Sequence, residues 1–386
     1  MAVDRIQGLR RERTLASPRY RDGRFENTVP VASPMKPGEQ WSTLREYFFG
    51  ARGVERRPTR ALPVESPLPG WARPASSGLR VTWLGHSTTL LELDGARVLT
   101  DPVWGERASP VSFAGPRRFH PAPVAIEGLP PLDAILVSHD HFDHLDRPTI
   151  RALARLGVPF VTSLGVGSHL QSWGVPAERI VELDWWESAS IGPLTFHATP
   201  ARHFSGRGPG TKNASLWSSW VIATDRHRVF FSGDTGLTPE FATVGDKLGP
   251  FDLVMLEVGA YHPSWGSIHL GPENALAAHR MLGSGALMPV HWGTFDLALH
   301  AWDEPAETLV TRRIPAGVQL VTPRLGRPVE PAHVEHVDAW WRGLGSHSVR
   351  RSISAHIAST STFRSGSPGT GSISPRVAAT SRTYRP

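Results

Sequence analysis

The segment SHDHFDHLD, residues 138–146, constrains this chain more than any other feature of its sequence. It directly follows Ala134–Val137 (AILV), a continuous apolar run typical of a buried strand. Open α/β sheets place ligand sites at the carboxyl ends of their strands. His139 and His141, two residues apart, can chelate one cation from an extended segment, while Asp143 and His144 can serve a second. Imidazole and carboxylate suit Zn²⁺, and also Fe or Mn. The segment therefore predicts a metal site at a strand end.

Three further candidate ligands lie shortly after later predicted strands. They are His203, Asp234 within SGDTG and His291 within VHWGTF. Taken singly, each of these residues has an ordinary structural explanation. As an ordered series after HxHxDH, each at the end of a strand, they are expected to complete the same metal site. The strands concerned are predicted at residues 194–198, 228–231 and 287–290.

The apolar pattern of the middle of the chain predicts an α/β fold. A cluster of strands comes first, and later strands alternate with helices, which predicts two sheets with helices on their outer faces. The remaining strands are predicted at residues 80–84, 88–93, 97–100, 216–223 and 253–257, and the helices at residues 148–156, 239–248, 272–282 and 304–313.

The net charge of +6 comes from the two ends of the chain. Residues 1–60 contain 13 basic and 7 acidic side chains, and residues 343–386 contain six arginines and no acid, whereas residues 61–342 contain 22 basic and 28 acidic groups. We therefore predict a basic, Pro/Arg-rich and partly disordered extension over 1–78, a folded domain over 79–342 and a disordered Ser/Arg-rich tail over 343–386. The acidic middle argues against a nucleic-acid partner.

The chain contains no cysteine, so disulfides and thiolate ligands are excluded, and a metal must be held by His and carboxylate. No apolar run reaches the roughly 18–20 residues needed to cross a bilayer. The first 30 residues contain seven arginines and no apolar stretch of a signal peptide. We expect a cytoplasmic protein without a transmembrane helix. Residues 41–49 predict a short amphipathic helix, which either caps the domain or makes peripheral membrane contact.

The whole series resembles the metallo-β-lactamase superfamily, and within it the N-acyl-phosphatidylethanolamine phospholipase D-like branch. HxHxDH followed by His203, SGDTG and PVHWGTF carries the likeness to the superfamily. The resemblance to the branch rests on segments between about residues 80 and 312: WLGHSTTLLEL, LTDPVW, GPRRF, DAILVSHDHFDHLD, ELDWWES, GPFDLVMLEVGAYHPSW, HLGPENA and HWGTFDLA. It implies an αββα sandwich of two mixed β-sheets flanked by helices, with a binuclear zinc centre at the edge of the sheets.

The resemblance also implies which residues hold each zinc ion. One would be bound by His139, His141 and His203, the other by Asp143, His144 and His291, with Asp234 bridging the two. Two such cations hold a water between them and lower its pKa toward about 7. The implied reaction is hydrolysis of a phosphodiester by a metal-bridging hydroxide. Asp143 and Asp234 are expected to be catalytic, together with His269, which matches a branch histidine and would bind phosphate or protonate the leaving group.

Several other residues near these motifs have two interpretations. Asp101, in LTDP, either accepts a hydrogen bond from a ligand histidine or forms a turn. His86 is either close to the ligands or part of a tight turn, and it is not predicted as a ligand. Trp185 and Trp186 either line the pocket or pack in the core. In the resembling branch a Gln-Tyr pair can precede GPRRF and help to bind lipid, whereas this chain has Ser112-Phe113.

The leading hypothesis is therefore a zinc-dependent phosphodiester hydrolase of phospholipase D type, acting on N-acyl-phosphatidylethanolamine-like lipids or other phosphodiesters. One alternative is a hydrolase of the same fold that acts on another ester, a lactone, a β-lactam or a cyclic phosphodiester. A nuclease is disfavoured because only 57 positions separate Asp234 from His291, too few for an inserted domain. An alternative from another class is a non-catalytic, membrane-associated binding protein. A homodimer is compatible with each hypothesis.

Overall fold

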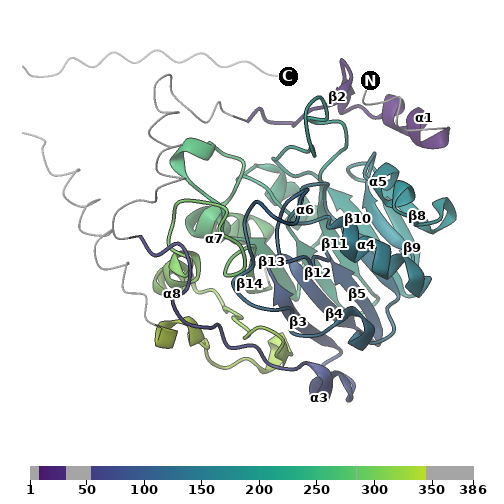
Figure 1. Cartoon of the computed structure of the whole chain (residues 1–386). Coiled ribbons are helices and arrows are strands. Elements are labelled where there is room, and N and C mark those ends of the chain that lie inside the picture. Colours follow the sequence, from purple (N-terminus) through teal and green to yellow (C-terminus); the bar gives the residue numbers. More distant parts are fainter. Residues whose placement is uncertain (1–7, 32–53, 284, 345–386) are drawn as a thin grey trace, which may run out of the picture. The chain divides into compact units, whose positions relative to one another are not determined.

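The computed structural model describes residues 8–31, 54–283 and 285–344. The helix predicted at residues 41–49 lies outside these ranges, as does the tail predicted to be disordered, apart from its first two residues. Two mixed sheets with helices on their outer faces form the body of the described chain, as Figure 1 shows. This arrangement confirms the predicted fold class.

The first sheet has seven strands in the order β15-β3-β4-β5-β6-β7-β8. Its first part is antiparallel, and β5 to β8 run parallel to one another. The parallel strand β6 precedes the histidine-rich loop. The strands are β3 (Leu79–Gly85), β4 (Thr88–Leu93), β5 (Ala96–Thr100), β6 (Ala134–Val137), β7 (Phe160–Ser163), β8 (Ile180–Leu183) and β15 (Pro328–Val329).

The second sheet has six strands in the order β14-β13-β12-β11-β10-β9. Strands β12, β13 and β14 are parallel, whereas β9 to β12 are antiparallel to their neighbours. Three of its strands, β10, β12 and β14, each precede a candidate ligand. The strands are β9 (Ser188–Ile191), β10 (Leu194–Thr199), β11 (Ser219–Ala223), β12 (Arg228–Phe231), β13 (Leu253–Glu257) and β14 (Ala286–Val290).

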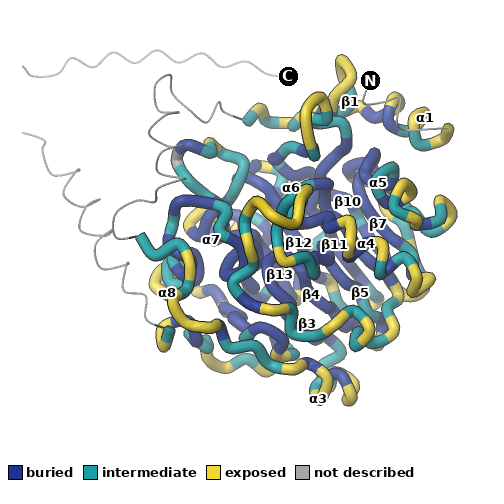
Figure 2. Tube along the Cα trace, viewed as in Figure 1, coloured by how far each residue is buried: buried dark blue, intermediate teal, exposed yellow. Residues whose placement is uncertain are grey.

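The main core lies between the two sheets, and a second core lies between the seven-stranded sheet and its helices. In β6, Leu136 belongs to the core between the sheets, while Ile135 and Val137 belong to the core beneath the helices. The strand is apolar at every position because both of its faces are covered. Figure 2 shows the strands buried and the exposed positions mostly in connections and on helices. The α-helices that follow β6 in the chain are α4 (Arg147–Leu153), α5 (Gly167–Ser172), α6 (Glu240–Leu248), α7 (Gly271–Leu282) and α8 (Glu304–Ala316).

The beginning of the described chain forms small elements of its own. Helix α1 (Leu9–Ala16) is followed by a two-stranded sheet of β1 (Tyr20–Arg21) and β2 (Arg24–Phe25), and α3 (Leu68–Trp71) precedes β3. Phe25 is buried in a third small core together with Trp185 and Trp217. Within the described residues, no helix combines the length and the apolar character that a bilayer-crossing segment requires.

Candidate metal centre

The loop after β6 is held in shape by the two acidic residues of its motif that are not predicted ligands. Asp140 is buried and accepts hydrogen bonds from the Gly206 amide at 2.7 Å and the Ser215 hydroxyl at 3.0 Å. Asp146 caps α4 by accepting from the Thr149 amide at 3.2 Å. The loop is thereby tied to the long connection between β10 and β11 at one end and to a helix at the other.

Three histidines and one carboxylate oxygen form a first group of candidate ligands. His141 Nδ1 lies 2.9 Å from His139 Nε2 and 3.2 Å from His203 Nε2. Asp234 Oδ2 lies 3.8 Å from His139 Nε2 and 3.6 Å from His203 Nε2. One atom from each of these four residues lies within 4.8 Å of the others. The spacing is that of ligands around one ion.

A second group lies on the other side of the same aspartate. Asp234 Oδ1 is 3.1 Å from both His144 Nε2 and His291 Nε2. Asp143 Oδ2 lies 3.5 Å from His144 Nε2 and 3.3 Å from His291 Nε2. All seven predicted ligands are therefore brought together, although they come from four separate parts of the sequence.

Several buried atoms of the second group lack the partners that such atoms normally have. His144 Nε2, His291 Nε2 and Asp234 Oδ1 are enclosed by protein yet form no hydrogen bond with any described residue. A buried polar atom without a partner is costly, so native structures rarely retain one without an ion, water or ligand. Because these atoms face one another and are nitrogen and carboxylate ligands, the site fits divalent cations.

A buried carboxylate orients two of the histidines from behind. Asp101, fully buried at the end of β5, accepts a hydrogen bond from His144 Nδ1–H at 2.7 Å. It also accepts from the amide and the hydroxyl of Ser138, both at 2.7 Å, and the Ser138 oxygen in turn accepts from His139 Nδ1–H at 2.9 Å. With Nδ1 of each ring held by these contacts, both rings turn Nε2 toward the centre. Asp101 therefore contacts the ligands, as the first of its two interpretations holds.

Burial and nearby charge set the protonation of the ligands. Burial lowers the pKa of His139 and of His203 well below the ordinary value, so both rings are neutral and able to bind a cation. Burial alone would raise the pKa of Asp234, but the adjacent His144 and His291 lower it well below its usual range. The Asp234 carboxylate is therefore ionised.

His86 lies beside the candidate ligands and also forms part of a tight turn, so both of its interpretations hold. It follows β3 with a φ of 54°, and its Nε2 is 3.0 Å from Asp143 Oδ2. Burial lowers its pKa to about 3, so the ring is neutral and donates this hydrogen bond. The left-handed turn after Gly85 directs the ring toward the centre. In the sequence, only the Gly-His pair at a strand end indicates this position of His86. A turn without any role at the site would explain that pair equally well.

His269 lies beside the ligands, and a buried glutamate fixes its orientation. Its ring centroid is 5.1 Å from that of His203 and 5.4 Å from that of His291. Nδ1–H donates to Glu257 Oε2 at 2.9 Å, and Glu257, at the end of β13, also accepts from the Leu270 amide at 3.0 Å. Burial opposes protonation, but the Glu257 carboxylate outweighs it and raises the pKa of His269. The ring can therefore carry a second proton on Nε2.

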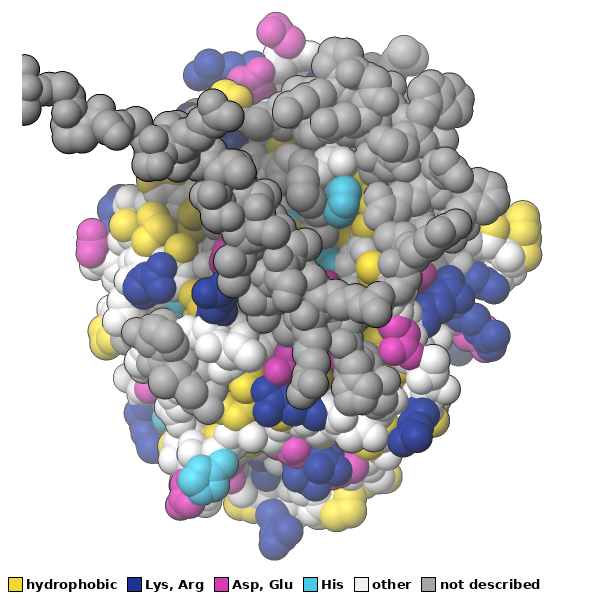
Figure 3. All heavy atoms as spheres, turned by 90° about the vertical axis from the view of Figure 1, so that its left-hand side faces the viewer, with side chains coloured by type: hydrophobic (Ala, Val, Ile, Leu, Met, Phe, Trp, Pro, Cys, Tyr) yellow, Lys and Arg dark blue, Asp and Glu magenta, His cyan; other side chains and the backbone are white. Residues whose placement is uncertain are grey.

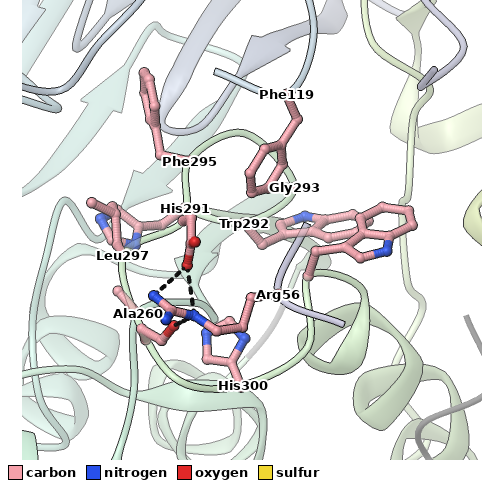
Figure 4. A pocket seen from close by; sticks show the side chains of 12 residues that line it. Arg56, Phe119, Ala260, His291, Trp292, Gly293, Phe295, Leu297 and His300 are labelled. Carbon is pink, nitrogen blue, oxygen red and sulfur yellow. Dashed lines mark hydrogen bonds and ion pairs between the residues drawn. The ribbon is translucent and has the colours of Figure 1, made fainter. Parts of the chain in front are cut away.

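The loop that follows His291 is held by an arginine from the N-terminal extension. Arg56 donates to Asp296 Oδ1 at 2.9 Å and to the Ala298 carbonyl at 3.0 Å. Figure 4 shows Arg56 below this loop, with dashed lines marking its interactions. On the other side, the Trp292 ring stacks on Trp83 at 5.3 Å between centroids. His291 is thus fixed by contacts on both sides of its loop.

Two cavities adjoin the candidate centre. One, of about 560 Å³, is lined by His203, Phe204, Trp265 and Ile268 and by residues of the N-terminal segment. The other, of about 850 Å³, includes Phe142 of the metal loop. Its lining contains four arginines: Arg107, Arg147, Arg151 and Arg207.

The two neighbouring tryptophans line neither cavity. Trp185 is buried and donates its indole N–H to the Trp217 carbonyl at 2.7 Å. Trp186 is 41 % exposed, with the ammonium group of Lys247 4.6 Å from its ring centroid. Trp185 therefore packs in a core and Trp186 lies on the surface.

The model of the β-lactamase superfamily domain matches residues 96–292. The chain is 48 % identical over 330 residues to an uncharacterised protein of Mycobacterium tuberculosis, covering 84 % of this chain and 88 % of that protein. It is 40 % identical over 235 residues to N-acyl-phosphatidylethanolamine-hydrolyzing phospholipase D 1 of Caenorhabditis elegans, covering 58 % of this chain and 66 % of that protein.

Among solved structures, the isothiocyanate hydrolase from Delia radicum gut bacteria matches with a TM-score of 0.53 and 22 % identity. The match covers 65 % of this chain and 98 % of that structure. At this identity the likeness is one of fold. The matched family segment, residues 96–292, contains all seven candidate ligands as well as His269.

Proposed function

The chain belongs to the β-lactamase superfamily and is a metallo-β-lactamase-fold hydrolase, and from this premise we propose that it is a binuclear, zinc-dependent phosphodiester hydrolase of phospholipase D type. The proposed substrates are N-acyl-phosphatidylethanolamine-like lipids. The proposed metal ligands are the seven residues already described, and the proposed hydrolase domain extends over residues 79–342.

One observation carries the binuclear part of the proposal. The two oxygens of Asp234 face different groups of histidines: Oδ1 faces His144 and His291, and Oδ2 faces His139 and His203. A carboxylate that binds one ion needs only one group of imidazoles beside it, whereas each oxygen of Asp234 faces a group of its own. The arrangement supports two adjacent cations with Asp234 between them.

The catalytic chemistry follows from the residues around that point. When bound, two such cations supply Lewis acidity and lower the pKa of a shared water toward about 7. Asp143 is held by His86 and keeps its carboxylate beside His144 and His291. His269 can carry a proton on Nε2 and donate it to the leaving oxygen of a diester, while its hydrogen bond to Glu257 keeps the ring in place.

Two features support a phospholipid among the diesters. The nematode relative carries that activity in its name, and it is 40 % identical to this chain over 235 residues. The cavity beside His203 is bordered by Phe204, Trp265 and Ile268, which suits a hydrocarbon chain. Phe113, which stands where the branch can have a tyrosine, is 81 % exposed and offers an apolar contact to a lipid surface, in keeping with peripheral membrane association.

On the face shown in Figure 3, acidic and basic side chains are interspersed among the described residues. A nucleic-acid site would present a continuous basic surface. The described residues on this face present no such surface, which favours the proposed lipid substrate over a nucleic acid.

A substrate panel tests the proposal. Zinc-loaded protein is offered N-acyl-phosphatidylethanolamine vesicles, a lactone, a β-lactam and bis(p-nitrophenyl) phosphate, and the lipid products are identified by mass spectrometry. We expect N-acylethanolamine and phosphatidic acid from the lipid, with the Asp234→Asn variant at least about a hundredfold slower because the bridge between the cations is lost.

Other outcomes of the same panel point to other functions. Diacylglycerol as the product would contradict cleavage of phospholipase D type. Preferential turnover of the lactone or β-lactam would establish the alternative hydrolase. Tight binding to anionic vesicles without any turnover in the presence of zinc would instead support a non-catalytic, membrane-associated protein.

A further inference from the structure

The segment around β1 and β2 is attached to the connection between β10 and β11. Phe25 is buried, its amide donates to the Asn213 carbonyl at 2.9 Å, and the Asn213 side chain donates to the Phe25 carbonyl at 3.0 Å. Tyr20 packs edge-to-face on Phe25, with centroids 5.0 Å apart. These contacts bring the next residues of the segment to the metal centre.

Asn27 makes a two-point contact with the main chain of a candidate ligand. Its Nδ2–H donates to the His203 carbonyl at 2.8 Å, and its Oδ1 accepts from the His203 amide at 3.1 Å. The same Oδ1 accepts from Trp217 Nε1–H at 3.2 Å, which orients the amide group. Both main-chain polar groups of His203 are therefore satisfied by one side chain from a distant part of the sequence.

The local fold explains why His203 needs this contact. Residues 200–218, between β10 and β11, contain no helix or strand. The hydrogen bonds of regular secondary structure therefore do not fix this backbone. His203 is fully buried, and among the described residues Asn27 is the hydrogen-bond partner of its amide and its carbonyl. Its ring has a separate restraint, because Nδ1–H donates to the Ile268 carbonyl at 2.9 Å. Asn27 fixes the backbone and Ile268 fixes the ring.

We propose that Asn27 is a positioning residue of the metal centre, which holds the main chain of His203 so that Nε2 remains in register with His139 and His141. The inference rests on the proposed function, because it assumes that these histidines bind a cation. Asn27 lies outside residues 96–292, which the family model matches. The N-terminal segment would then contribute a residue that positions a metal ligand.

The expected effect is on one of two bound ions. Partners behind the ligands typically affect metal affinity by about 10–100-fold. Replacing Asn27 with Ala removes both hydrogen bonds to His203, so the cation held by His139, His141 and His203 should leave faster by about that factor. The cation held by Asp143, His144 and His291 should leave at the wild-type rate, because Asn27 contacts none of these residues.

The test measures release of Zn²⁺ from loaded full-length protein to a chromogenic chelator. Asn27→Ala and Asn27→Asp are compared with wild type and with Arg13→Ala. Asn27→Asp keeps the size and the acceptor oxygen but sets a second carboxylate oxygen against the His203 carbonyl. Arg13 attaches the same segment to Glu187 and to the Glu182 carbonyl, without contacting His203. Melting of the zinc-free proteins, followed by circular dichroism, separates loss of fold from loss of metal.

We expect both Asn27 variants to release one zinc equivalent faster than wild type. Arg13→Ala should release both zinc equivalents at the wild-type rate. The melting curve of zinc-free Asn27→Asp should stay close to that of wild type. Wild-type release rates in both Asn27 variants would overturn the inference and leave the proposed function intact. Equal acceleration in Arg13→Ala would also overturn it, because the effect would then be general loosening of the segment. Failure of wild type to bind zinc would contradict the proposed function itself.

Discussion

Asp234 illustrates how much of this site depends on single residues. It is followed by Thr235 and lies in a glycine-flanked turn after β12, where the backbone is free to place its carboxylate between two groups of histidines. The position after a strand was visible in the sequence. Which oxygen would face which histidine was not, because that depends on how two sheets pack against each other.

His86 shows what sequence reasoning cannot supply at this scale. Its φ of 54° is uncommon for a residue other than glycine, although histidine adopts it more often than most, and nothing in LGHS distinguishes such a conformation from an ordinary turn. Asp101 was recognisable as a candidate from its place after β5, but its three hydrogen bonds to Ser138 and His144 follow from the tertiary structure.

Asp101→Asn should impair the site while leaving its shape. The new side-chain NH2 group would face a group that also donates a hydrogen bond. That group is the Ser138 amide, the Ser138 hydroxyl or His144 Nδ1–H. We expect zinc affinity and kcat to fall by about 10–100-fold. Both are measured on purified protein, with Asp133→Asn as the matched control, since Asp133 accepts from the Arg97 amide at an exposed position. An unaffected Asp101→Asn enzyme would show that the carboxylate does not act on the ligands.

His120 should make the fold sensitive to mild acid. Burial, together with Arg118, lowers its pKa to about 3, and the neutral ring is hydrogen-bonded to Thr294. In the unfolded chain its pKa is about 6.5. As the pH falls below about 6.5, the unfolded state binds a proton that the folded state does not, so this stabilisation is present above pH 6.5 and declines toward pH 3.

The measurement is urea unfolding of wild type and His120→Gln at pH 7 and pH 5. Between these values the wild type should lose about 2 kcal/mol more of its free energy of unfolding than the variant, which has no titrating ring. Parallel losses in the two proteins would mean that His120 titrates normally in the fold.

At the scale of elements, the strongest predictions were for strands covered on both faces. Ala134–Val137 is uniformly apolar and proved to be β6. Strand β9 (Ser188–Ile191) has an exposed face and few apolar residues, and it was not predicted. The strand predicted at 216–223 begins at Ser219, because Leu216 and Trp217 pack with Phe25 instead. That contact involves a segment about 190 positions away, which periodicity does not reveal.

Strand β6 lies inside the sheet and leads into the metal loop. Shortening one of its buried side chains should therefore destabilise the domain. Leu136→Ala removes a fully buried side chain between the two sheets, and we expect the free energy of unfolding in urea to fall by about 2–5 kcal/mol. Leu156→Ala, at a position that is 47 % exposed, should change it by less than about 0.5 kcal/mol. Similar losses in the two variants would contradict the packing of β6 between two cores.

At the scale of the whole molecule, two mixed sheets bring strand ends from distant parts of the sequence to one place. The predicted fold class follows from the order of strands and helices, which is a local property repeated along the chain. The contribution of the N-terminal residues was beyond sequence analysis. Residues predicted only as a basic extension include Asn27 at His203 and Arg56 at the loop after His291.

The central claim is that seven side chains hold two adjacent cations, and anomalous X-ray scattering from crystals of the zinc-loaded protein tests it most directly. If two cations are bound, the anomalous map should show two peaks about 3.5–4 Å apart, both next to Asp234. One should lie by His203 and the other by His291. A single peak, or peaks located away from Asp234, would contradict it.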